Sequence, residues 1–147
     1  MDEEIKSLES NHTFQLTLLP DDQPLVVSKW VYAINQEPKK KKKYKARFCA
    51  KGFKQVENVN YTETFSPSAK LSSIRVLLQL STNSNLQFLH QLDAKLDHTI
   101  YVIEPEGYQK ISDKGVKLVM KLKKALYGLK QAGKMWYNLL TDIIIVM

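Results

Sequence analysis

The clearest pattern in this sequence is an apolar stripe near its end. The stripe follows the i, i+3, i+4, i+7 spacing of one helix face, and its members are Ala132, Met135, Trp136, Leu139, Leu140, Ile143 and Ile144. An amphipathic helix of this kind buries its apolar face against another layer of structure. The stripe therefore predicts a helix that packs against elements supplied by the preceding residues.

Strand-like segments rich in β-branched and aromatic residues supply such a layer. They lie at 30–35, 44–53, 88–94, 99–103 and 116–122. Two further helices are predicted, one over 2–9 and one that begins after Ser72 or Ser73, either of which can serve as its N-cap. Because strands, helices and hairpins interleave, the predicted class is α+β with a largely antiparallel sheet and flanking helices. A chain of 147 residues suits a single domain of this kind.

Basic side chains are in excess and clustered. The sequence holds 22 Lys plus Arg against 15 Asp plus Glu, which gives a formal net charge of +7. Most of the excess lies in 39–47 (KKKKKYKAR) and in 121–134 (KLKKALYGLKQAGK). Such clustering favours a polyanion as partner, nucleic acid before a membrane. The five lysines 39–43 are interpreted as the solvated tip of a hairpin, with nuclear localisation or nonspecific phosphate contact as alternatives.

Cysteine usage and the first residues bear on the compartment. Cys49 is the only cysteine, so no internal disulfide can form and a reducing compartment is favoured. The first residues, MDEEIKSLESN, are acidic where a signal peptide is basic, and no apolar run approaches the roughly 18 residues of a membrane span. We therefore expect a soluble, intracellular protein, cytoplasmic or nuclear, without a membrane partner.

Aromatic residues outside the terminal stripe are interpreted as packing residues rather than as platforms for stacked bases. They are Trp30, Phe48, Phe53, Tyr61 and Phe65. Cys49 follows Phe48 on a predicted strand and is expected to behave as a small, buried or half-buried hydrophobe.

Seven blocks of the sequence occur in an order that carries a family resemblance. The blocks are KSLESNHTFQLTLLP, SKWVYAIN, YKARFCAKGFKQ, YTETFSPSAKLSSIRVLLQL, LHQLDAK, IYVIEPEGY and LKKALYGLKQAGKMWY. From about Lys6 to about Trp136 the chain resembles the reverse transcriptase of copia-type retrotransposons, an RNA-directed DNA polymerase within a Pol polyprotein. The resemblance implies a partial right-hand polymerase fold, fingers-like over about 6–80 and an incomplete palm over about 81–147.

The same resemblance implies nucleotidyl transfer assisted by metal ions. Two Mg²⁺ ions about 3.5–4 Å apart stabilise the attacking and leaving oxygens, and clustered carboxylates hold them. In the family one carboxylate comes from the aspartate that Asp93 of HQLDAK matches, and a pair comes from a Tyr-x-Asp-Asp turn downstream. Asp93 is thus the predicted catalytic residue and Mg²⁺ ligand. Without the neighbouring blocks, Asp93 would be interpreted as a turn residue at a strand end.

Two departures from the family pattern predict that catalysis is lost. The segment after Asp93 is several residues shorter than in the family, so Asp97 matches an acid beyond the turn and is not a second catalytic carboxylate. The missing segment includes the aromatic residue that packs under the nucleotide sugar in the family. No Tyr-x-Asp-Asp occurs in the sequence, and a single carboxylate holds two divalent cations poorly. We therefore expect no polymerase activity from this chain by itself.

The predicted binding residues fall in two of the blocks. Lys45 and Arg47 match the YKAR block, which implies contact with the phosphates of an incoming dNTP, bidentate in the case of arginine. The YGLKQ block implies residues that line an RNA or DNA template-primer, and it supplies Tyr127, Gly128, Lys130 and Gln131. The resemblance further implies that Gly128 lets the backbone approach the substrate. From the residues alone, the alternatives are a solvated strand face and a glycine turn ahead of a helix.

Three functions follow from these observations. The first is a catalytically silent part of a copia-type reverse transcriptase. The second is a nucleic-acid-binding module derived from one, and the third is the first part of a longer, active polymerase that contains Tyr-x-Asp-Asp downstream. Signatures of the other Pol domains, protease, integrase and RNase H, are missing from the sequence.

Overall fold

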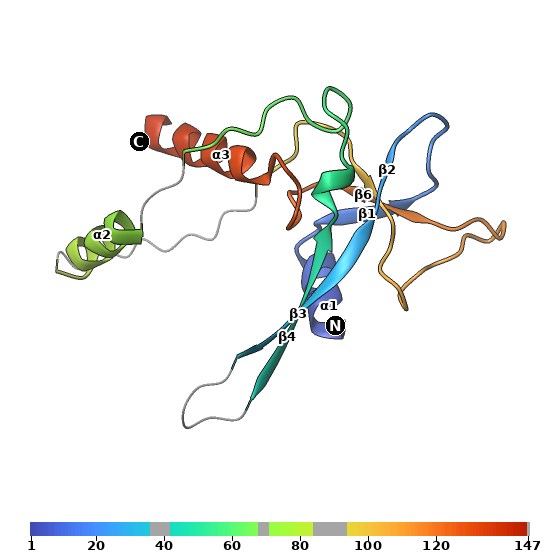
Figure 1. Cartoon of the computed structure of the whole chain (residues 1–147), viewed down its shortest axis with the longest axis horizontal. Coiled ribbons are helices and arrows are strands. Elements are labelled where there is room, and N and C mark those ends of the chain that lie inside the picture. The colour runs from blue at the N-terminus through green and yellow to red at the C-terminus, as the bar shows by residue number, and fades with distance from the viewer. Residues whose placement is uncertain (36–41, 68–70, 84–93, 147) are drawn as a thin grey trace.

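A computed structural model of the chain describes residues 1–35, 42–67, 71–83 and 94–146 (Figure 1). Helices and strands are both present along these residues, in an α+β arrangement. The elements are α1 (Asp2–Ser10), β1 (Phe14–Thr17), β2 (Leu25–Val26), β3 (Ser28–Asn35), β4 (Lys43–Ala50), a 3-10 turn (Gly52–Lys54), α2 (Leu71–Asn83), β5 (Tyr101–Val102), β6 (Val119–Leu122) and α3 (Ala132–Val146). The predicted fold class is therefore confirmed at the level of α+β.

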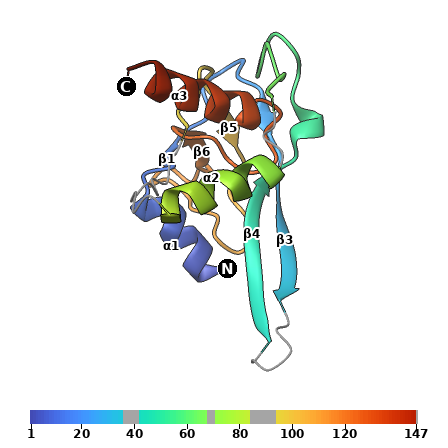
Figure 2. The same ribbon diagram turned by 90° about the vertical axis from the view of Figure 1, so that its left-hand side faces the viewer.

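Two sheets make up the strand layer. One has four strands in the order β1-β6-β5-β2, and the other is the β3–β4 hairpin. The pairs β1–β6, β5–β6 and β3–β4 are antiparallel, whereas β2 and β5 run parallel. The largely antiparallel sheet is thus confirmed, with one parallel pair that the sequence did not predict. In Figure 2, strands β1, β5 and β6 lie between α3 and α1.

The β3–β4 hairpin extends away from the four-stranded sheet (Figure 1). One residue, Val27, separates β2 from β3, and its carbonyl accepts a hydrogen bond of 2.7 Å from the backbone N–H of Lys51. This bond ties the base of the hairpin to the sheet. The predicted hairpin is confirmed, while most of its predicted lysine tip, at 39–41, lies outside the described residues.

The core lies where the hairpin base meets the four-stranded sheet. Its buried members come from several elements and the loop after β6: Val26, Phe48, Ala50, Ile100, Val102, Met120, Leu122, Leu126 and Leu129. On α1, Ile5 is buried and Leu8 packs against this core, which confirms the helix and the apolar face predicted over 2–9. Burying an aliphatic or aromatic side chain contributes about 1.5–3 kcal/mol, so this cluster is a main source of stability.

The terminal helix α3 confirms the helix predicted from the apolar stripe. Met135 is buried, and Ala132 packs against the core. Trp136 departs from the predicted packing role, because 47% of its surface is exposed to solvent. Among the described residues, no helix combines the length and the apolar character needed to cross a membrane.

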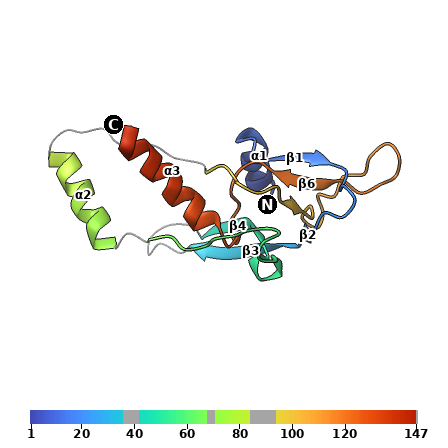
Figure 3. The same cartoon turned by 90° about the horizontal axis from the view of Figure 1, so that it is seen from above.

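The helix α2 differs from the sequence prediction in its start and in its surroundings. It begins at Leu71, so Ser72 and Ser73 lie inside the helix and the predicted N-cap is wrong. Figures 1 and 3 show α2 beyond α3, apart from both sheets. Leu78 and Leu80, two members of its predicted apolar face, are accordingly exposed.

The predicted packing role of the other aromatic residues is confirmed only in part. Phe48 and Tyr61 are buried, and the rings of Trp30 and Phe48 lie 5.7 Å apart between centroids. Phe53 and Phe65 are exposed, so the prediction is wrong for both. Phe53 lies in the 3-10 turn and Phe65 in the loop before α2, where no layer of the described fold covers them. The predicted strand at 88–94 lies outside the described residues except for Ala94, which is buried.

Candidate functional site

The strand β4 places Lys45 and Arg47 on one face of the hairpin. Side chains alternate between the two faces of a strand, and Phe48 points into the core. Arg47 therefore points to the opposite face, and Lys45, two residues earlier on the same strand, points to that face as well. In the register of the hairpin, Arg47 pairs with Val31 and Lys45 with Ala33, so small or apolar neighbours flank both basic side chains. Both side chains are exposed to solvent.

The loop after β6 brings Tyr127 to the same face. The Cζ atom of Arg47 lies 5.6 Å from the centroid of the Tyr127 ring, a cation–π distance. The carbonyl of Tyr127 accepts a hydrogen bond of 2.8 Å from the backbone N–H of Ala50, which fixes the loop against the end of β4. The Tyr127 side chain is still 63% exposed, so its ring is accessible from solvent.

These three side chains line one cavity between α1, β4 and the loop after β6. Its volume is about 230 Å³, and Lys124 and Glu4 line it as well. We call this the basic cavity, because three of its charged side chains are cationic. The structure thus brings together the predicted residues Lys45, Arg47 and Tyr127, although about eighty residues of sequence separate the first two from the third.

Glu4 is a charged member of this cavity that the sequence analysis missed. Its Oε1 accepts a hydrogen bond of 3.3 Å from the backbone N–H of Phe48, which holds α1 beside β4. The carboxylate therefore stays close to the cations of the basic cavity, where it opposes the binding of an anion. The one available signal was the acidic first turn of α1, formed by Asp2, Glu3 and Glu4.

Gly128 is the point at which two backbone segments touch. Its φ is +89°, and a Cβ at this position would lie 2.2 Å from the carbonyl oxygen of Ala50. The reverse contact is as close, because a Cβ on Gly52 would lie 2.1 Å from the carbonyl oxygen of Gly128. In this structure, the backbone that Gly128 approaches is therefore that of the same chain.

Gln131 and Lys130 join the loop after β6 to the segment that follows the 3-10 turn. The Gln131 side chain is 1% exposed; its Oε1 accepts a 3.0 Å hydrogen bond from Gln55, and its Nε2 donates one of 2.8 Å to the carbonyl of Asn60. Lys130 Nζ donates a 2.8 Å hydrogen bond to the hydroxyl of Tyr61 and lies 4.6 Å from its ring centroid. Direct contact of the Gln131 amide with a template would require this network to open.

Asp93, the predicted catalytic residue and Mg²⁺ ligand, lies outside the described residues. The Oδ1 atom of Asp97 lies 2.9 Å from the Nδ1 atom of His98. Among residues 1–35, 42–67, 71–83 and 94–146, no three His, Cys, Asp or Glu side chains gather as a metal ion requires. The described residues alone therefore do not fit Mg²⁺, and we derive no reaction step through it.

Cys49 lies on β4 near the basic cavity, and the structure confirms that it is buried. Burial raises the pKa of the Cys49 thiol, while the charges of Lys29 and Arg47 act in the opposite direction and that of Glu4 in the same direction. A thiol with a raised pKa is protonated near neutral pH and is a weak nucleophile. Cys49 is accordingly a packing residue.

A family model described as "Reverse transcriptase (RNA-dependent DNA polymerase)" matches residues 11–147. The chain is 39% identical over 145 residues to the retrovirus-related Pol polyprotein from transposon TNT 1-94 of Nicotiana tabacum. The matched region covers 93% of this chain and 11% of that relative. It is 33% identical over 156 residues to the Pol polyprotein from transposon RE1 of Arabidopsis thaliana, covering 100% of this chain and 10% of the relative.

These similarities define the class of the protein. The chain belongs to the reverse transcriptase family, and within it to the copia-type retrotransposon Pol polyproteins. It spans about a tenth of the length of the Pol polyproteins named above. No solved structure matches the chain. The resemblance carried by the seven sequence blocks is therefore confirmed at the level of the family.

Proposed function

We propose that the basic cavity is a phosphate-binding site of a reverse-transcriptase segment and that it holds a dNTP or a template-primer. The observation that carries this proposal is the convergence of Lys45, Arg47 and the accessible Tyr127 ring on one cavity. Residues 6–80 would then be fingers-like, and residues 81–147 would belong to the palm.

The chemistry of these side chains suits a polyanion. The Lys45 ammonium is a compact charge, and the Arg47 guanidinium can donate two parallel hydrogen bonds to one phosphate. Tyr127 offers an aromatic face against which a base can stack, which is worth about 1–3 kcal/mol per base in single-stranded complexes. Lys130 contributes less direct contact, because its ammonium is already bonded to Tyr61.

We propose further that these residues bind without catalysing synthesis by themselves. Asp93 would be one of the carboxylates that hold Mg²⁺, as the family resemblance implies. Tyr-x-Asp-Asp does not occur in the sequence, so the remaining carboxylates would have to come from elsewhere. Since the curated relatives are about ten times longer, the runner-up function is the first part of an active polymerase. Sequencing the transcript beyond the codon for Met147 separates the two, because only the runner-up requires an in-frame Tyr-x-Asp-Asp downstream.

Charge reversal in the basic cavity should weaken nucleic-acid binding. We expect Lys45→Glu combined with Arg47→Glu to lower the affinity for a DNA primer annealed to an RNA template by about tenfold or more, because two phosphate contacts become repulsive. The slope of log K against log salt should also become shallower, by about one for each phosphate that the protein no longer neutralises. Fluorescence anisotropy of a labelled primer measures both quantities.

The matched control changes the same net charge at another place. Lys114 and Lys117 are exposed in the segment before β6, and Figure 1 shows this segment extending away from the β3–β4 hairpin. The double variant Lys114→Glu with Lys117→Glu changes the total charge by the same amount as the cavity variant. We expect this control to reduce affinity far less than the cavity variant. Equal losses for both double variants would show that binding follows net charge alone, and the proposed site would be wrong.

Removal of the acid in the basic cavity should have the opposite effect. Glu4→Gln keeps an acceptor for the Phe48 N–H and takes away a negative charge, so we expect binding of the same duplex to tighten about two- to fivefold. Glu3→Gln is the control, since Glu3 is exposed and does not line the cavity. The effect should decrease above about 0.5 M salt, because the Debye length is then short and salt screens the charge of Glu4. If both variants gained the same affinity, the gain would come from the change in net charge, and the position of Glu4 in the basic cavity would not matter.

A further inference from the structure

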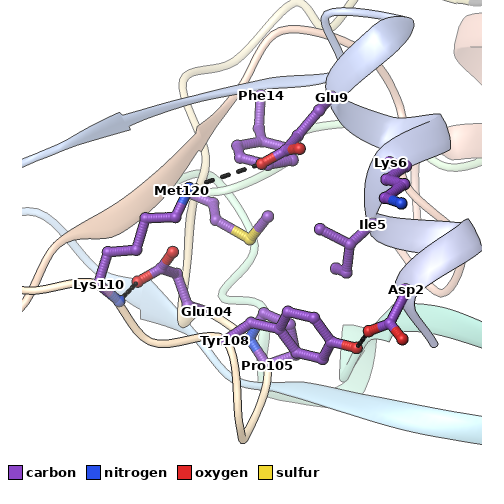
Figure 4. Close-up of a pocket in the computed structure, with 10 residues that line it drawn as sticks. All are labelled: Asp2, Ile5, Lys6, Glu9, Phe14, Glu104, Pro105, Tyr108, Lys110 and Met120. Carbon is purple, nitrogen blue, oxygen red and sulfur yellow. Dashed lines mark hydrogen bonds and ion pairs between the residues drawn. The ribbon is translucent and has the colours of Figure 1, made fainter.

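A second cavity lies under α1, between this helix, the turn after β5, and strands β1 and β6 (Figure 4). Its volume is about 350 Å³, within the range of about 300–1,000 Å³ that is usual for small-molecule sites. Much of its wall is apolar, formed by Ile5, Phe14, Pro105, Tyr108 and Met120. None of these residues lines the basic cavity, so the two sites are separate.

Glu104 is a buried carboxylate in the wall of this second cavity, which we call the Glu104 cavity. Its side chain is 5% exposed, and its Oε2 accepts a hydrogen bond of 2.6 Å from the backbone N–H of Lys110. Its Oε1 has no hydrogen-bond partner in the part of the chain that the structure describes. Because Glu104 lines the cavity, Oε1 is available to accept a charge-assisted hydrogen bond from a cationic group bound there.

The cations near Glu104 offset its charge only in part. Lys110 directs its ammonium to Glu9, with 3.6 Å between Nζ and Oε1, so only its backbone N–H donates a hydrogen bond to Glu104. No Lys, Arg or His side chain of the described residues lies within ion-pair distance of the Glu104 carboxylate. Asp2 also faces the cavity, and it accepts a hydrogen bond from the Tyr108 hydroxyl (Figure 4).

The charges around the Glu104 cavity favour a cation over an anion. Three carboxylates line it, those of Asp2, Glu9 and Glu104, against the two ammonium groups of Lys6 and Lys110. This is the reverse of the chain as a whole, which carries a formal net charge of +7. A ligand that matches the cavity has a positively charged head and an apolar body.

We propose that the Glu104 cavity binds a small organic ammonium ion. The ammonium group donates a hydrogen bond to Oε1 of Glu104, and the apolar body packs against Ile5, Phe14 and Met120. The charge-assisted bond supplies the missing partner of the carboxylate, and the apolar contact removes hydrocarbon surface from water. This site is independent of the phosphate site proposed above, because it takes a ligand of opposite charge on other residues.

The test uses 2-phenylethylammonium as the probe and the full 147-residue chain. Titration calorimetry gives the affinity, and ¹H–¹⁵N spectra locate the site through shifts of the Lys110 and Tyr108 amides. We expect saturable binding that weakens at least tenfold in Glu104→Gln, which keeps an oxygen for the Lys110 N–H but loses the charge. Glu106→Gln is the matched control: Glu106 is exposed two residues away, and its change should leave the affinity as it is.

Two further measurements separate charge recognition from nonspecific binding. The neutral probe 2-phenylethanol has nearly the same shape and should bind at least tenfold more weakly than the amine. Burial raises the pKa of Glu104, while the Lys110 N–H and charge act against the shift. Amine binding should therefore fall off on acidification at a higher pH than an ordinary glutamate would give, since protonation removes the anion.

A variant that fills the cavity guards against failure of the Glu104 variant to fold. Ile5→Phe adds bulk at the apolar wall, leaves Glu104 unchanged, and should also weaken amine binding. Equal affinity of the wild type and Glu104→Gln, equal affinity for the amine and the alcohol, or no saturable binding below 10 mM amine (about −2.7 kcal/mol) would each overturn the proposal.

Discussion

Gly128→Ala is expected to destabilise the protein by about 3 kcal/mol or more. Two effects add at this position. The backbone φ of +89° is one that a residue with a Cβ adopts only under strain, and the new Cβ would lie 2.2 Å from the carbonyl oxygen of Ala50. That oxygen belongs to backbone held by neighbouring hydrogen bonds, so the overlap can be relieved only by separating the loop from β4. The midpoint of urea unfolding, followed by circular dichroism, measures the loss.

Gly107→Ala is a matched control for the strain alone. Gly107 has a similar φ of +87°, but a Cβ there would meet nothing within 4 Å. We expect this variant to lose only about 1 kcal/mol, the usual cost of forcing a left-handed backbone on alanine. The difference between the two variants isolates the contact between Gly128 and Ala50. Equal losses would mean that this contact has no energetic weight.

The parts of the fold that the sequence predicted are those with a local signal. The apolar spacing in 132–144 and the face of Ile5 and Leu8 each repeat within one helix, so the period alone predicts α3 and α1. The β3–β4 hairpin also follows from composition, because its strands are near neighbours. The strand β2 was missed, since it has two residues and is defined by its parallel pairing with β5 far along the chain.

The candidate site shows a similar division. Motif resemblance singled out Lys45, Arg47 and Tyr127, but their meeting in one cavity depends on a crossing of distant backbone segments at Gly128. Patterns within a short stretch of sequence do not indicate which distant backbone segments will cross. For the same reason Glu4 was missed, because its importance comes from the packing of α1 beside β4 rather than from its neighbours in sequence.

Gln131→Leu is expected to reduce the free energy of unfolding by about 2–4 kcal/mol. The leucine has a similar size but leaves the Nε2 of Gln55 and the carbonyl of Asn60 buried without their partner. Each buried polar group that loses its hydrogen bond costs about 1–3 kcal/mol. Thermal unfolding measures the loss, and Gln109→Leu, at an exposed glutamine, serves as the control and should change stability by less than about 0.5 kcal/mol.

The comparison of stability with binding in Gln131→Leu decides what this residue does. If the amide mainly joins the loop after β6 to the segment of Gln55 and Asn60, stability falls, and the affinity for the primer duplex, measured below the unfolding temperature, changes little. If the amide instead contacts the template, loss of one hydrogen bond lowers the affinity about tenfold, while the free energy of unfolding stays near that of the wild type. The buried position of Gln131 and its two hydrogen bonds favour the first result, which would make it a residue that positions Tyr127 and Gly128 for the basic cavity.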